Sequence, residues 1–262
     1  MDHVSIERDG RVAIVRFDRG DGVNGLSHAL MTSLVNVARS FEDDLDTAAV
    51  VLTGAPAVFT LGYDLKDPAG RERRAGGLGE RRRAAQLGPR MCRAWEAIEP
   101  MTFVAIEGWC VGGGAALAVA CDIRVAAENA TLYVPEVELG MNMSWQSVPR
   151  FVNLMGPART KRLVAMAEKV SAERAREWGL VDEVAPAGGA LARALELARR
   201  VAELPPVQVR MCKQGIDAAA KALNHAVSFM DADQFTLAQG SEDFAEGVRS
   251  FLEKRKPKYT GR

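Results

Sequence analysis

The chain has 262 residues, 48% of them hydrophobic, which is enough for one large core or for a core with an appended region. Lys plus Arg and Asp plus Glu both number 34, so the formal net charge is zero, which argues against a dedicated nucleic-acid binder. The four cysteines, Cys92, Cys110, Cys121 and Cys212, form no CxxC pair, so neither a zinc site nor a disulfide framework is expected. We expect reduced, buried thiols and no bound metal.

The N-terminal segment is charged where a signal peptide needs an apolar run. The longest weakly polar stretch, residues 108–121, is too short to span a bilayer. These two features predict a cytoplasmic protein that does not bind a membrane.

The first half of the chain alternates short strands with helices. Residues 4–7 and 11–17 predict a hairpin that turns at Asp9-Gly10. Ser27 opens an amphipathic segment that reaches about Asp43, and residues 49–53 predict a short buried strand. A loop rich in Gly, Pro and charge is expected over residues 54–79, followed by a helix that ends near Ile98, before Pro100.

The centre repeats this order. Residues 102–106 predict a strand, 108–114 a turn, 115–120 a helix and 123–126 another strand. Strands and helices that alternate at such short intervals favour an α/β fold with crossover connections.

The C-terminal third is predicted to be helical. Helical patterns run over residues 158–167, 171–178, 190–204, 207–223, 225–239 and 242–256, interrupted only at 180–184. We therefore expect two regions, a core over residues 1–190 that carries the site and a helical region over 191–262.

The residue inventory limits the chemistry. The three histidines, His3, His28 and His225, do not sit in a nucleophile motif, and both GxSxG and the phosphate-binding GxxxxGK[ST] are absent. If the chain is an enzyme, its proton carrier is therefore expected to be a carboxylate.

Two glycine-bearing turns follow predicted strands, at residues 59–66 and 108–114. The second contains Gly112-Gly113-Gly114 directly before a helix, where a ligand could approach the backbone closely because no Cβ intervenes. The alternative is that these glycines only allow tight packing of the helix on the strand.

In their order along the chain, these segments resemble the enoyl-CoA hydratase/isomerase (crotonase) family. The resemblance covers nearly the whole sequence, and its order is more specific than any single motif. It is carried by Asn24-Gly-Leu26, Ala49-Val-Val-Leu-Thr-Gly54, Phe59-x-x-Gly62-Tyr63-Asp64-Leu65, Val104-Ala-Ile-Glu-Gly108, Gly112-Gly113-Gly114, Ala120-Cys-Asp122-Ile-Arg124, Pro135-Glu136-Val-Glu-Leu-Gly140, Gly156, Ser171-Ala-x-x-Ala175-x-x-Trp-Gly179-Leu-Val181 and Glu246-Gly247-x-x-Ser-Phe251-Leu-Glu-Lys254-Arg-Lys256.

The resemblance implies a core of repeated ββα turns, the fold also seen in ClpP-like proteins, and C-terminal helices that form a homotrimer or hexamer. It implies that the backbone N–H groups of Tyr63 and Gly113 bind the thioester oxygen of an acyl-CoA. CoA would then be part of the substrate, and no separate cofactor is expected. Besides these residues, the expected pocket consists of Leu61, Gly62, Trp109, Gly112, Ala116, Met141 and Trp145.

The chain departs from the hydratase pattern at one carboxylate. Hydratases of the family resemble one another in having two glutamates; the second corresponds to Glu136, whose pKa we expect to be raised by apolar neighbours. The first corresponds to Ala116. A single base can move a proton between two carbons, so we expect Δ3-Δ2 enoyl-CoA isomerisation, with hydration as the alternative.

Basic residues are the remaining candidates. Lys66 and Lys254 resemble family positions near the CoA phosphates, and the resemblance allows Lys254 to reach its phosphate across a subunit boundary. Six arginines, Arg71, Arg73, Arg74, Arg81, Arg82 and Arg83, form a cluster that predicts a solvated face, or contacts to CoA phosphates. A non-catalytic acyl-CoA binder or an RNA-binding relative is the alternative of another class, although the zero net charge argues against nucleic acid.

Overall fold

The large sheet grows from the N-terminal hairpin. The computed structural model describes residues 3–262, without the side chains of residues 71, 73 and 74. In it β1 pairs antiparallel with β2, and each later neighbour is parallel, in the order β1-β2-β3-β4-β6-β9. These strands are β1 (Val4–Asp9), β2 (Val12–Phe17), β3 (Ala49–Thr53), β4 (Met101–Ile106), β6 (Ile123–Ala127) and β9 (Glu183–Ala185).

A second, smaller sheet creates the repeated ββα unit. It consists of β5 (Trp109–Val111), β7 (Thr131–Tyr133) and β8 (Val170–Ser171). β4 leads into β5 and then α5 (Gly113–Ala118), whereas β6 leads into β7 and then the 3₁₀ helix η1 (Glu136–Leu139). After β3, Thr60 forms an isolated bridge to Cys110 on the same small sheet. The expected α/β core of repeated ββα turns is therefore confirmed.

Helices cover both faces of the large sheet. On one face lies α1 (His28–Arg39), whose first turn is capped by the Ser27 hydroxyl, which accepts a hydrogen bond from the Leu30 amide. It packs with α4 (Leu87–Glu96) over a core that contains Leu34 and Trp95.

The segment between β3 and β4 is more helical than predicted. The expected loop contains α2 (Pro68–Ala75), and the expected helix that follows is divided into α3 (Leu78–Ala85) and α4. α2 was not predicted because its sequence is charged, contains a glycine and shows no apolar stripe. Its start is nevertheless defined, because the Asp67 side chain accepts a hydrogen bond from the Ala69 amide.

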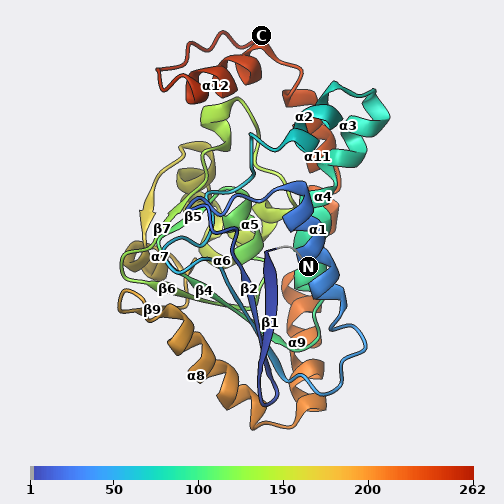
Figure 1. The fold of residues 1–262 in the computed structure, drawn as a ribbon, viewed down its shortest axis with the longest axis vertical. Helices are drawn as coiled ribbons and strands as arrows, with labels where there is room; N and C mark the ends of the chain where they lie inside the picture. The colour runs from blue at the N-terminus through green and yellow to red at the C-terminus, as the bar shows by residue number, and fades with distance from the viewer. Residues whose placement is uncertain (1–2) are drawn as a thin grey trace.

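The opposite face of the sheet is covered by α8 (Ala190–Ala202). Ala190, Ala194 and Ala198 are fully buried on it, in one apolar cluster with Val51 and Phe103 of the sheet. Figure 1 shows α8 running beneath the strands, far from the C-terminal end. The helix that begins at the predicted boundary after residue 190 thus packs on the sheet of the core.

The remaining helices extend from this core. Among the described residues they are α6 (Ser147–Thr160), the π-helical turn η2 (Lys161–Ala165), α7 (Ala172–Trp178), α9 (Pro206–Ala220), α10 (Asn224–Ser228), α11 (Asp231–Ala238) and α12 (Glu242–Leu252). The single helix expected over residues 225–239 is two helices, α10 and α11. Figure 1 places α12 above α5 and β5, at the end of the molecule opposite α8.

Cys92, Cys110 and Cys121 are buried free thiols, as expected, whereas Cys212 is exposed. In the part of the chain that the structure describes, no helix combines the length and the apolar character that crossing a membrane requires.

Candidate active site

The two glycine-bearing turns lie against each other. Thr60 joins them by two backbone hydrogen bonds. The Thr60 amide donates to Trp109 O at 3.0 Å, and the Val111 amide donates to Thr60 O at 3.0 Å. A Cβ on Gly62 would lie 2.7 Å from Val111 O and 3.6 Å from Gly113 N, and the φ of Gly62 is +86°. Only glycine fits here, so the backbone of Gly62-Tyr63 comes directly beside that of Gly112-Gly113.

The glycine run is held by the small sheet. The Gly112 amide donates to Tyr133 O at 2.8 Å, and Gly112 adopts a positive φ of 52°. Gly113 is the first residue of α5, and the first amides of a helix have no acceptor within the helix. The backbone at Gly113 can therefore present its N–H outward from the helix.

Glu136 places its carboxylate on the same glycine run. A Cβ on Gly112 would lie 2.5 Å from Glu136 Oε1, and Oε2 is buried with no hydrogen-bond partner among the described residues. The residue as a whole is half-buried, but its carboxylate is enclosed. Burial raises the pKa of Glu136 to about 7, as we predicted for a base that works near neutrality.

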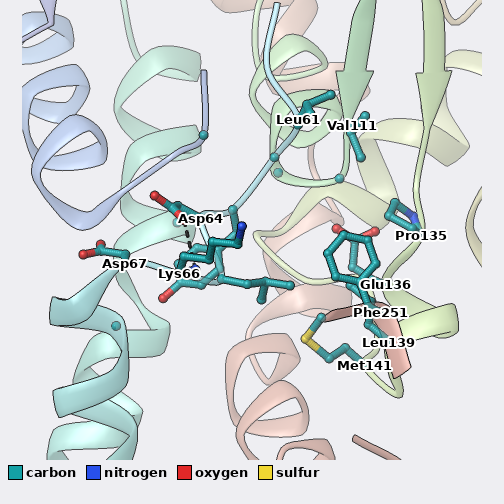
Figure 2. A pocket seen from close by; sticks show the side chains of 18 of the residues that line it. Leu61, Asp64, Lys66, Asp67, Val111, Pro135, Glu136, Leu139, Met141 and Phe251 are labelled. Atoms are coloured by element: carbon teal, nitrogen blue, oxygen red, sulfur yellow. Dashed lines mark hydrogen bonds between the residues drawn. The ribbon is translucent and has the colours of Figure 1, made fainter. Parts of the chain in front are cut away.

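These groups line one cavity of about 1390 Å³. Figure 2 shows Glu136, Met141 and Phe251 gathered on one side and Lys66 and Asp67 on the other. Ten of the predicted site residues line this cavity: Leu61, Gly62, Tyr63, Lys66, Trp109, Gly112, Gly113, Glu136, Met141 and Trp145.

Two predicted site residues lie elsewhere. Ala116 is fully buried in the hydrophobic core, where its amide bonds Gly112 O within α5, so it is not part of the cavity wall. Lys254 is exposed beyond the end of α12, and its neighbours Arg255 and Lys256 line the cavity instead. The sequence could not separate these neighbours because α12 ends at Leu252, and the direction of the following residues is set by tertiary contacts.

The structure describes the side chains of only some arginines of the predicted cluster. Arg81 lines the cavity, and Arg82 forms an exposed ion pair with Asp233 at 2.6 Å. The side chains of Arg71, Arg73 and Arg74 lie outside the described part of the chain.

Trp145 is the largest side chain beside the glycine run. A Cβ on Gly113 would lie 2.3 Å from its Cζ3, and a Cβ on Gly88 would lie 2.0 Å from its Cε2. The indole therefore spans the gap between the start of α4 and the start of α5, and it needs glycine at both ends. The sequence predicted that Trp145 lines the pocket, but it did not predict that the indole packs between Gly88 and Gly113.

A polar wall of the cavity was not predicted. His28 Nδ1 lies 2.9 Å from Asp67 Oδ2, and the two side chains are only 6% and 9% exposed. Both residues line the cavity together with Tyr63. One sequence signal existed, because an aspartate directly before a proline is typical of a helix start, and Asp67-Pro68 begins α2.

Comparisons with known proteins identify the family of this chain. The model of the family described as "Enoyl-CoA hydratase/isomerase" matches residues 7–262. The chain is 30% identical to the 2,3-dehydroadipyl-CoA hydratase of Escherichia coli (strain K12) over 100% of both chains. It is also 30% identical to the short-chain-enoyl-CoA hydratase of Clostridium acetobutylicum, over 98% of this chain and 97% of that one.

A solved structure, that of carnitinyl-CoA hydratase from Mycobacterium avium, superposes with a TM-score of 0.88 at 30% identity, covering 100% of both chains. Since the family match, these identities and the crotonase fold all extend over nearly the full length, the chain belongs to the enoyl-CoA hydratase/isomerase family.

Proposed function

We propose that this family member binds an acyl-CoA thioester, stabilises its enolate with the amides of Tyr63 and Gly113, and transfers a proton through Glu136. The observation that carries the proposal is the enclosed Glu136 carboxylate, which touches the backbone of Gly112 and has a pKa of about 7. A carboxylate of that pKa can take up and release a proton at neutral pH.

The amides supply the second part of the chemistry. Removal of a proton from the carbon beside a thioester moves negative charge onto the carbonyl oxygen. Fixed N–H donors that meet this oxygen in a site shielded from water stabilise the charge, and removal of one such donor typically costs about 10²- to 10³-fold in rate. A Cβ added at Gly62 would lie only 3.6 Å from the backbone nitrogen of Gly113. This short distance between the two turns supports the proposal that both bind the same thioester oxygen.

Isomerisation of a Δ3 to a Δ2 enoyl-CoA is the reaction that one carboxylate explains best. The base removes a proton from the carbon beside the carbonyl and returns it two carbons further along, while the double bond moves into conjugation. Ala116 offers only a methyl group, and it is buried away from the cavity. Addition of water needs a group that activates the water and a group that handles the proton at the adjacent carbon, and one carboxylate can do both only by relaying the proton.

Hydration is the second candidate. It is favoured by the relatives, because the two described above are named as hydratases. In that case Glu136 would both activate the water and return its proton.

The test is to assay both reactions on one preparation. We expect isomerisation of Δ3 enoyl-CoA to exceed hydration of Δ2 enoyl-CoA, and Glu136→Gln to lower turnover by about 10²- to 10⁴-fold because the general base is lost. Glu177→Gln, at an exposed glutamate of α7, is the matched control. Efficient hydration without isomerisation would replace our preferred reaction by the alternative, and full activity of Glu136→Gln would refute the role of Glu136.

We infer that the nucleotide end of CoA lies near Lys66, Arg255 and Lys256, because these cations line the cavity and come from two segments that are far apart in the sequence. CoA is then the handle of the substrate rather than a separate cofactor. A contribution of Lys254 from a neighbouring subunit remains a prediction, as does a cytoplasmic location.

We further propose that the chain assembles as a homotrimer or hexamer through its C-terminal helices. This proposal is supported by the exposed apolar side chains of these helices and of the segments between them: Val207, Met211, Ile216, Leu223, Val227, Phe229, Met230, Leu237, Phe251 and Leu252. Such a density of exposed apolar groups is typical of surfaces that are buried in an assembly.

A further inference from the structure

The polar wall opposite Glu136 is built from a fixed histidine. Asp67 Oδ2 accepts hydrogen bonds from the His28 amide at 2.7 Å and from His28 Nδ1 at 2.9 Å, and Oδ1 accepts from the Ala69 amide at 3.1 Å. Burial by itself would raise the pKa of Asp67, but these hydrogen bonds hold it below its ordinary value. Asp67 therefore fixes the orientation of the imidazole through Nδ1, and the second ring nitrogen, Nε2, takes no part in this contact.

Tyr63 brings a second polar group to the same place. Its ring meets the His28 ring edge to face, with centroids 5.9 Å apart and planes at 80°. A Cβ on Gly70 would lie 2.5 Å from Tyr63 Oη and 3.3 Å from His28 Cε1. The phenol and the imidazole therefore converge beside Gly70, and a phenol can donate and accept hydrogen bonds at once.

This wall is within reach of an acyl chain. The Tyr63 amide belongs to the proposed oxygen site, so the phenol lies one tyrosine side chain away from the thioester carbonyl. Glu136 and Asp67 lie on opposite sides of the cavity (Figure 2). An unsubstituted alkyl end placed against the His28 ring would offer no hydrogen bond to Nε2, which is unfavourable for a buried polar atom.

We propose that His28, oriented by Asp67 and accompanied by Tyr63, forms a subsite for a hydroxyl group carried by the acyl chain several carbons from the thioester. The subsite rests on the proposed function, because it assumes that the acyl chain occupies this cavity. Its ligand class is a hydroxylated acyl-CoA, whose hydroxyl forms a hydrogen bond with Nε2.

A purely structural role of the pair makes a different prediction. Asp67 joins the starts of α1 and α2 through backbone amides, and that link requires no imidazole at position 28. A structural histidine would change stability but would not discriminate between acyl chains.

The experiment compares the binding of two unreactive thioesters, hexanoyl-CoA and ω-hydroxyhexanoyl-CoA, by calorimetry. We expect the unmodified chain to bind the hydroxylated thioester roughly fivefold to tenfold more tightly, as one additional neutral hydrogen bond allows. His28→Phe should abolish this preference while retaining the affinity for hexanoyl-CoA to within about twofold. His225→Phe, the same change at an exposed histidine, should leave the preference intact.

His28→Asn covers the case in which the phenylalanine variant does not fold, because its amide can still donate to Asp67 but is too short to reach the ligand. A preference that survives in either folded variant, or is absent from the unmodified chain, overturns the subsite. Equal binding of both thioesters with Glu136-dependent turnover of hexenoyl-CoA refutes the subsite alone. Binding of neither thioester refutes the subsite and the proposed function together.

Discussion

At the scale of single residues, the environment of one carboxylate determines the chemistry. Pro135-Glu136-Val137-Glu138 contains two glutamates that composition cannot distinguish. Glu138 is exposed and bonds the Tyr133 hydroxyl, whereas the Glu136 carboxylate is enclosed against Gly112. Only the second arrangement raises a carboxyl pKa to about 7, so the base is defined by burial rather than by residue type.

Activity should therefore rise with pH through about 7, because Glu136 must be ionised to accept a proton. Stability should change in the opposite direction. The folded-state pKa is raised above the ordinary value of 4.5, so the stabilisation is complete below 4.5 and is lost as pH rises through about 7.

Thermal melts of Glu136→Gln check this linkage. The variant should melt above the unmodified chain at pH 8, and the difference should shrink towards pH 4.5. Glu177→Gln should follow the unmodified chain throughout. Superimposable pH profiles of stability for Glu136→Gln and the unmodified chain would contradict a buried, titrating Glu136.

At the scale of elements, three helices hold Trp145 beside the proposed oxygen site. Trp145 and Gln146 both have positive φ values, 60° and 57°, which non-glycine residues adopt only when their surroundings impose them. Arg150 of α6 donates to both of their carbonyls and forms a two-point ion pair with Glu96 of α4. Asp231 of α11 accepts from the Gln146 amide. The strained pair is thus fixed from α4, α6 and α11 at once.

Gly88→Ala tests this arrangement, because the added methyl group would lie 2.0 Å from Trp145 Cε2. We expect the indole to be displaced from Gly113, with a loss of about 1–3 kcal/mol in stability, as for overpacked cores, and an altered preference among enoyl-CoA chain lengths. Melting curves and kcat/KM for short and long thioesters measure the two effects.

Gly79→Ala is the matched control, since a Cβ there would have nothing within 4 Å and α3 should gain helix propensity. If Gly88→Ala folds with unchanged stability and chain-length preference, Trp145 does not form the wall that its contacts indicate.

At the scale of the whole molecule, the C-terminal helices leave apolar side chains exposed to solvent. Val207 and Met211, four residues apart on α9, are 60% and 65% exposed, so they form one apolar face. α8 has its apolar face on the sheet, but no described residue of the same chain covers the exposed face of α9. This difference is the physical argument for assembly.

The double variant Val207→Glu/Met211→Glu should weaken assembly, because it would bury like charges without partners at a subunit interface. Sedimentation should give a mass of three or six chains for the unmodified protein and a smaller mass for the variant. Leu45→Glu, at a side chain that is 76% exposed outside the C-terminal helices, should not change the mass. A monomeric unmodified protein would contradict the proposed assembly.

The sequence by itself determined the features that local pattern encodes. The hairpin at Asp9-Gly10, the strand over residues 49–53 and the glycine run at the start of α5 could be predicted because turn residues and apolar periodicity are local. The order of these motifs was sufficient to indicate the family.

Only the tertiary structure decided which side chains share a cavity and which are removed from water. His28 and Asp67 are 39 residues apart, and Glu96 and Arg150 are 54 residues apart, so no periodicity relates them. Ala116 was expected in the pocket from its place after the glycines, but its direction from α5 is fixed by core packing. Desolvation and cavity shape depend on contacts between distant segments, and these exist only once the chain has folded.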